Sequence, residues 1–132
     1  MRRLWSMGLV GCLAACGVED PAADDGIVVS ASGRYELSAA FSPDPPQVGA
    51  NTWTLDLRTR AGVPVVDAAL TAEPWMPVHG HGVPVVPKVV AEGEGSYRVE
   101  NLRFTMPGTW EVRVELSTDE DKDQLVVRSD VQ

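Results

Sequence analysis

The sequence predicts an all-β fold, an immunoglobulin-like antiparallel β-sandwich of about seven strands. From Ile27 onward, apolar residues recur at every second position, which is the period of a half-buried strand. Glycine- and proline-rich turns separate these runs at intervals of about 8–12 residues. No segment has a sustained helical period, so both observations point to the same fold class.

Two runs, 51–59 and 109–117, carry the clearest alternation and predict strands with one buried face. The first places Trp53, Leu55 and Leu57 on one side, and the second places Trp110, Val112, Val114 and Leu116 on one side. Shorter runs repeat the pattern at Tyr35, Leu37, Ala39 and Phe41, at Val66, Ala68, Leu70 and Ala72, and at Leu125 and Val127. We expect these faces, with three tryptophans including Trp75, to form one core.

One predicted strand changes its parity part-way. Its apolar residues are Tyr97 and Val99, and then Leu102, Phe104 and Met106. A slip of one residue would turn the second set to the wrong face of the sheet. We therefore expect a β-bulge near Glu100-Asn101, which would also aim Met106 at the end of the strand.

The first 15 residues predict a bacterial lipoprotein signal peptide. Arg2 and Arg3 precede the apolar run Leu4–Leu13, which is too short to span a bilayer as a helix. The segment ends in Leu13-Ala14-Ala15-Cys16, which resembles a lipobox. That resemblance implies cleavage before Cys16 and lipidation of its thiol. The alternative is an ordinary secretory peptide cut after Ala15, which would leave Cys16 as a free thiol.

The lipobox predicts a protein of the bacterial cell envelope, anchored by lipid on the periplasmic face of a membrane. Gly17 follows the cysteine, and by resemblance to sorted lipoproteins this favours the outer membrane. Cys12 leaves with the signal peptide and Cys16 carries the lipid, so the mature domain has no thiol. A blue-copper electron-transfer site needs a cysteine ligand. That function is excluded.

Charge and length set further bounds. Loss of Arg2 and Arg3 changes the formal net charge of −8 to −10, since −8 − 2 = −10 and the 19 acidic residues follow the signal. Such an acidic chain is unsuited to nucleic acid. Residues 16–26 are expected to be a flexible tether, and residues 27–132 are long enough for one small domain. The membrane, through the lipid, and an envelope protein are the expected partners.

The segment Trp75–Gly82 is the strongest candidate for a site because it holds both histidines of the chain, His79 and His81. Copper(I) accepts thioether and imidazole ligands, and copper(II) prefers imidazole. Met76-Pro77 and Met106-Pro107 repeat one dipeptide, and they could meet if both lie at one end of the sandwich. The candidate copper ligands are therefore Met76, His79, His81 and Met106, and the sequence suggests no cofactor other than copper.

Other interpretations of these residues remain open. A methionine beside tryptophan and proline is more often a packing residue, and His-Gly-His can be a polar connector. The acidic segment Asp119–Asp123 lacks the glycine and glutamate of an EF-hand loop and fits a solvated hairpin tip. Ser96, Thr105 and Thr109 have no neighbouring histidine–carboxylate pair that would activate a nucleophile. We therefore predict no enzymatic activity.

Several short segments, in order, resemble the YtkA-like/FixH-like domain of bacterial envelope proteins. They are Val48–Asn51, Gly62–Val65, Trp75–Pro77 with His79–Gly82, Gly95–Tyr97 and Phe104–Trp110. The resemblance covers roughly Phe41 to Leu116. It implies an immunoglobulin-like sandwich outside the cytoplasm, in a family associated with copper handling or copper-oxidase assembly. FixH-type proteins have a transmembrane anchor, so the lipobox here weakens the link to oxidase assembly. Position 78 is also Val, where a methionine-rich loop would have offered another soft ligand.

Two functions follow as hypotheses. The first is a lipid-anchored envelope protein that binds copper and buffers or delivers it through the His/Met loop. The second is a structural or protein-interaction module of the envelope that binds no metal, since a shared fold does not imply a shared function.

Overall fold

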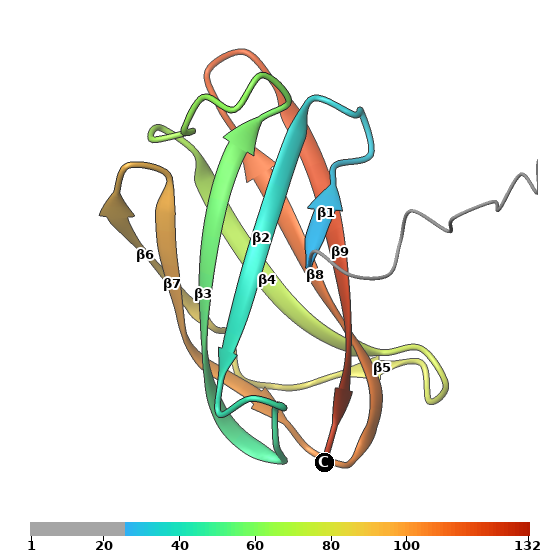
Figure 1. Ribbon diagram of the computed structural model, residues 1–132. Coiled ribbons are helices and arrows are strands. Elements are labelled where there is room, and N and C mark those ends of the chain that lie inside the picture. The colour runs from blue at the N-terminus through green and yellow to red at the C-terminus, as the bar shows by residue number, and fades with distance from the viewer. Residues whose placement is uncertain (1–25) are drawn as a thin grey trace, which may run out of the picture.

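The computed structural model describes residues 26–132, which form two antiparallel sheets packed face to face (Figure 1). One sheet has the strand order β1-β2-β3-β7-β6 and the other has the order β5-β4-β8-β9. The strands are β1 (Ile27–Val29), β2 (Tyr35–Ser42), β3 (Gly49–Thr59), β4 (Ala69–Met76), β5 (His81–Gly82), β6 (Lys88–Gly93), β7 (Ser96–Phe104), β8 (Gly108–Ser117) and β9 (Lys122–Val131). The expected all-β, immunoglobulin-like sandwich is confirmed.

Some of the sequence predictions fall on residues that the structure does not describe. The signal peptide (1–15), the lipidated Cys16 and all of the tether except Gly26 lie outside the described residues. Residues 26–132 contain no helix long and apolar enough to cross a membrane.

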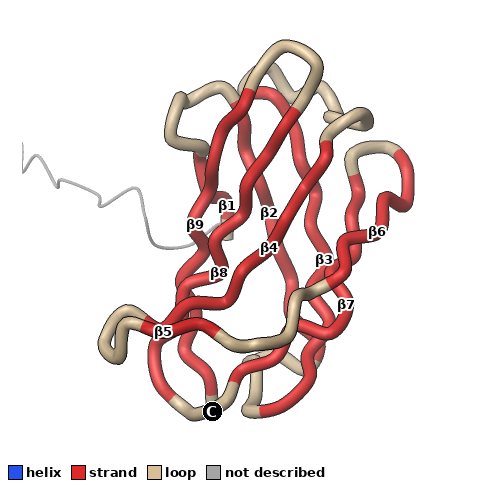
Figure 2. Tube along the Cα trace, turned by 180° about the vertical axis from the view of Figure 1, so that it is seen from behind, coloured by secondary structure: helices blue, strands red, loops and turns tan. Residues whose placement is uncertain are grey.

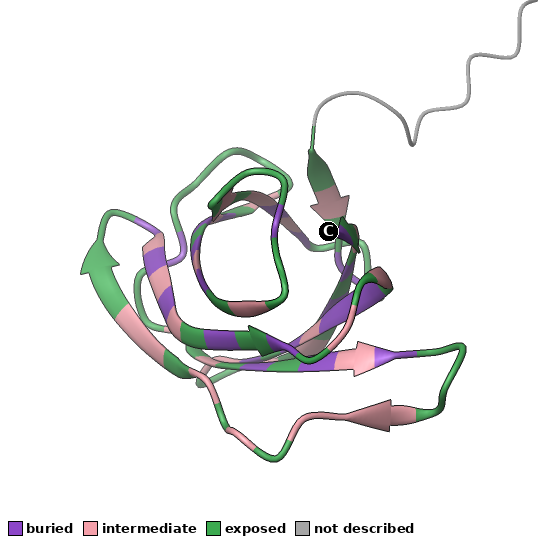
Figure 3. Ribbon diagram, turned by 90° about the horizontal axis from the view of Figure 1, so that it is seen from below, coloured by how far each residue is buried: buried purple, intermediate pink, exposed green. Residues whose placement is uncertain are grey.

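The core lies between the two sheets and follows the predicted alternation. Trp53 on β3 and Trp110 on β8 are fully buried. The ring of Phe104 on β7 lies 5.3 Å from that of Trp110, so aromatic side chains join the two sheets directly. Figure 3 shows these alternating buried and exposed positions along the strands.

Trp75 departs from the prediction that three tryptophans share the core. On β4 the buried residues are Ala72, Pro74 and Met76, so Trp75 faces the opposite side of the sheet. The guanidinium of Arg113 lies 4.6 Å from the centre of the Trp75 ring. Trp75 is therefore half-buried under a cation–π contact on the outer face.

The predicted bulge on β7 is confirmed. Asn51 pairs with Leu102, and Trp53 pairs with Val99, so two residues of β7 face one residue of β3. The extra residue is Glu100 or Asn101, and Asn101 has a φ of 60°. The bulge returns Leu102 to the buried face of the strand, as the apolar pattern requires.

Other strand boundaries differ from the expectation. Val66 is exposed, and Val65 is the buried residue of that segment. The backbone amide of Val65 donates to Leu57, and its carbonyl accepts a 2.6 Å hydrogen bond from the Tyr97 hydroxyl. These contacts hold the segment to the other sheet, and β4 begins only at Ala69. Residues 26–132 form nine strands instead of about seven, because β1 and β5 are very short and β6 is an edge strand (Figure 2).

Candidate metal site at the β4–β5 hairpin

Both histidines belong to the tight hairpin that joins β4 to β5 at one end of the sandwich. The amides of His79 and Gly80 donate to the carbonyl of Met76, over 3.2 Å and 2.9 Å. His81 then pairs with Met76 across the two strands. In Figure 3, which views the molecule from this end, the hairpin projects to one side. The chain therefore turns between Met76 and His81 and does not run extended through His79.

The turn nevertheless brings the two imidazole rings together. Their centres lie 5.7 Å apart and their planes differ by 24°. The His81 ring also meets the buried Trp110 edge-on, with 6.2 Å between the ring centres. His79 is exposed and His81 is half-buried, so the pair runs from solvent toward the core.

A hydrogen bond fixes the tautomer of His81. Its Nδ1 lies 3.1 Å from the carbonyl oxygen of Gly82. A carbonyl can only accept, so Nδ1 carries a proton, and in the neutral ring Nε2 then keeps its lone pair. Metal-binding histidines commonly hold their second nitrogen in this way.

Met76 lies directly beside His81 on the inner face of the sheet. Opposite residues of an antiparallel pair have Cβ atoms about 4.5–5.5 Å apart, and their side chains share a face. Met76 is only 4% exposed, and its methyl carbon lies against Gly108, the first residue of β8. The thioether therefore extends from β4 to the start of β8.

Met106 lies two residues before Gly108 and is partly buried against the core. Its carbonyl accepts a 2.9 Å hydrogen bond from the indole nitrogen of Trp110. Since Met76 reaches Gly108, the two Met-Pro dipeptides lie at the same end of the sandwich. The sequence analysis required both dipeptides to lie at one end if they were to share an ion, and the fold places them there.

The donors fit a soft metal ion better than a hard one. Within residues 26–132, no three His, Cys, Asp or Glu side chains gather where they could hold an ion. A site here must therefore use the thioethers as well as the imidazoles. An imidazole nitrogen binds a metal at about 2.0 Å, so the centres of two rings on one ion are roughly 5–6.3 Å apart. The observed 5.7 Å lies within that range, but the rings are stacked with their planes 24° apart, so the exposed His79 would have to turn for both nitrogens to point at one ion.

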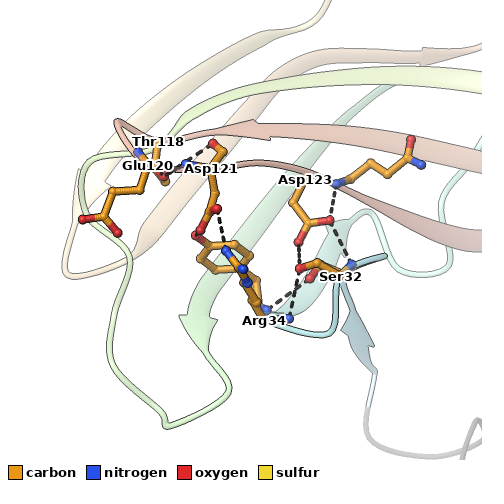
Figure 4. Close-up of polar contacts among 9 residues, drawn as sticks. Ser32, Arg34, Thr118, Glu120, Asp121 and Asp123 are labelled. Carbon is orange, nitrogen blue, oxygen red and sulfur yellow. Dashed lines mark hydrogen bonds and ion pairs between the residues drawn. The ribbon is translucent and has the colours of Figure 1, made fainter.

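A second concentration of polar side chains lies at the opposite end, where the β1–β2 turn meets the β8–β9 hairpin (Figure 4). Arg34 donates to Asp121 over 2.5 Å, and Tyr35 donates to the same carboxylate over 3.2 Å. Asp123 accepts from the hydroxyl and the amide of Ser32. These contacts join two turns, and the acidic segment is a hairpin tip as predicted.

The pKa of Asp123 reflects this network. Burial alone would raise it, but hydrogen bonds from Ser32, Ser30 and the backbone amide of Gln124 outweigh the burial and lower the pKa to about 2. The carboxylate is therefore ionised over the whole range of ordinary pH.

A broad hollow on the described surface lies away from the histidines. It lies over the outer face of the β4-β8-β9 sheet, beside the Val83–Pro87 segment, and includes Glu73, Arg113 and Glu115. Its mixed, shallow lining brings no set of ligands together. We place the candidate site at the hairpin because the chemistry of the donors lies there.

Residues 29–115, which include both histidines, Met76 and Met106, match the model of the family described as YtkA-like. The chain belongs to the YtkA-like family. The resemblance drawn from the sequence is thereby confirmed.

One solved structure of similar fold is that of a DUF4426 family protein from Pseudomonas aeruginosa PAO1. It matches this YtkA-like protein with a TM-score of 0.52 at 12% identity, over 74% of this chain and 90% of that one. At that identity the likeness supports the fold alone. None of the curated proteins matches the chain.

Proposed function

We propose that this YtkA-like protein binds copper at the β4–β5 hairpin and buffers or delivers the ion without catalysis. The observation that carries the proposal is the pair of imidazole rings of His79 and His81, 5.7 Å apart. The free Nε2 of His81 and the neighbouring Met76 add a nitrogen and a sulfur donor at the same place. The association of the family with copper handling supports the same function.

The donor set also favours a carrier over an electron-transfer centre. Residues 26–132 contain no cysteine, so the copper would be cargo that imidazole and thioether groups exchange. His79 lies in solvent, where a donor or acceptor protein could reach the ion, and Met76 lies inside. Met106, in the adjoining turn, is the second thioether that could complete the set.

The test is competition for copper between a chelator and the full chain, purified in detergent. We expect stoichiometric binding of Cu(I) and Cu(II) that is lost in the double variant His79→Ala/His81→Ala. Circular dichroism of both proteins controls for loss of the fold. If the wild type binds copper no better than the double variant, the proposal is wrong and the metal-free interaction module replaces it.

We also propose that the protein reaches the envelope as a lipoprotein, anchored through Cys16 to the periplasmic face of a membrane. The lipobox before Cys16 is the support. Metabolic labelling with a fatty acid should mark the wild type and not Cys16→Ala, and that variant should leave the membrane fraction. Labelling of both proteins alike would exclude Cys16 as the lipidated residue.

A further inference from the structure

We propose that Gly108 is a positioning residue for this copper site and strengthens its binding of Cu(I) relative to Cu(II). The absence of a side chain at Gly108 gives the Met76 thioether room to lie beside His81 as a ligand. The inference rests on the proposed copper function and adds to it a residue and a preferred oxidation state.

The space at Gly108 is occupied by one chemical group. A Cβ built on Gly108 would lie 2.7 Å from the methyl carbon of Met76, closer than real Cβ contacts allow. Among the described residues, no other heavy atom beyond the chain neighbours of Gly108 lies within 4 Å of that position. A methyl group at this position would therefore displace the end of Met76 and little else.

Displacement of the thioether would affect the two oxidation states differently. Cu(I) binds thioether sulfur well, whereas Cu(II) prefers the nitrogens of His79 and His81. Methionine is flexible and repacks at small cost to the core. The main consequence of a side chain at Gly108 is therefore a misplaced sulfur, and a loss that falls mainly on Cu(I).

Gly49 supplies a matched control. Gly108 has a φ of 134° and Gly49 has a φ of 104°, so alanine is strained at both positions. Gly49 pairs with Phe104, the last residue of β7, yet no described atom beyond its chain neighbours lies within 4 Å of its missing Cβ. Gly49→Ala therefore imposes the backbone strain without the contact to Met76.

The experiment measures Cu(I) and Cu(II) affinities of the full chain by chelator competition for the wild type, Gly108→Ala, Gly49→Ala, Met76→Leu and the double variant Met76→Leu/Gly108→Ala. We expect Gly108→Ala to weaken Cu(I) binding by about tenfold, as the loss of a residue that orients a ligand does. The Cu(II) affinity of Gly108→Ala should stay near that of the wild type. The affinities of Gly49→Ala for both ions should also stay near those of the wild type. In the Met76→Leu background, Gly108→Ala should have no further effect on Cu(I).

A metal-free measurement tests the same contact. In protein labelled with ¹³C at the methionine methyl groups, the Met76 signal, identified by its loss in Met76→Leu, should shift in Gly108→Ala and not in Gly49→Ala.

If Gly108→Ala does not fold, Met76→Leu alone decides, because wild-type Cu(I) affinity in that variant overturns the inference. Equal effects of Gly108→Ala in both backgrounds also overturn it. Wild-type protein that binds no copper refutes both proposals, whereas histidine-dependent binding without Met76–Gly108 coupling refutes only this one.

Discussion

At the residue scale, Tyr97 on β7 is joined to the segment before β4 by one buried hydrogen bond. Its hydroxyl donates to the carbonyl of Val65 over 2.6 Å, and burial raises the pKa of the phenol. We expect Tyr97→Phe to lower the free energy of unfolding by about 1–2 kcal/mol, because the carbonyl loses its partner. Urea denaturation measures this. The control is Tyr35→Phe, because the Tyr35 hydroxyl donates to the partly exposed Asp121 and its removal should lower the free energy of unfolding by less. Equal losses in the two variants would contradict the explanation.

A second prediction concerns Asp123, whose pKa is about 2 in the folded protein against 3.8 ordinarily. A pKa lowered by folding means that the folded state favours the ionised carboxylate. This stabilisation is complete above pH 3.8 and is lost as the pH falls toward 2. We expect it to be about 1 kcal/mol after solvent screening of a partly exposed group.

The check is thermal unfolding of the wild type and Asp123→Asn as a function of pH. Near pH 6 the variant should melt at a lower temperature, and the difference should shrink between pH 4 and pH 2. A difference that does not change with pH would assign the loss to hydrogen bonding and not to the charge of Asp123.

The candidate site also shows what single residues can and cannot predict. His79, His81 and the two methionines are identifiable because soft and imidazole donors are rare in this chain. Gly108 is not, because its role depends on contact with Met76, which lies far away in sequence. In the sequence alone it is only the glycine of a turn.

At the element scale, the bulge on β7 sets the register of the strand beyond it. Deletion of Asn101 would remove the extra residue and turn Leu102 and Phe104 out of the core. We expect the deletion variant to be unfolded, as judged by loss of the near-ultraviolet circular dichroism signal. Asn101→Gly keeps the bulge and suits a φ of 60°, so it should fold normally. A folded deletion variant would show that β7 can restore the register in another way.

Strands with one buried face were predictable, and edge strands were not. β3 and β8 alternate because each has a core on one side and solvent on the other. β6 has no fully buried residue, and β5 has only two residues, so neither leaves a strong period. β4 starts later than expected, because Val65 is held by Leu57 and Tyr97 before that strand begins. Contacts between residues so far apart cannot be predicted from the local sequence pattern.

At the scale of the whole molecule, β8 runs between two ends of the sandwich that have different roles. It runs from Gly108, beside the candidate copper site, to Ser117, beside the turn that contains Asp121. At about 3.3 Å per residue this is a distance of roughly 30 Å. The end with the Asp121 and Asp123 network stabilises the fold, and the other end holds the candidate ligands. Changes at the two ends should therefore be independent.

The last prediction tests this independence. If copper binds only the folded protein, a saturating amount should raise the melting temperature, since a ligand stabilises the state that binds it. Asp123→Asn should lower the melting temperature at neutral pH but keep the wild-type copper affinity and the full copper-induced increase. His79→Ala/His81→Ala should keep most of the metal-free melting temperature, because His79 is exposed and His81 half-buried, and should lose the increase. Scanning fluorimetry with and without Cu(I) measures the melting temperatures and their increases, and chelator competition measures the copper affinity. A reduced copper affinity in Asp123→Asn would mean that β8 couples the two ends, because the network and the hairpin lie at opposite ends of the sandwich (Figure 1).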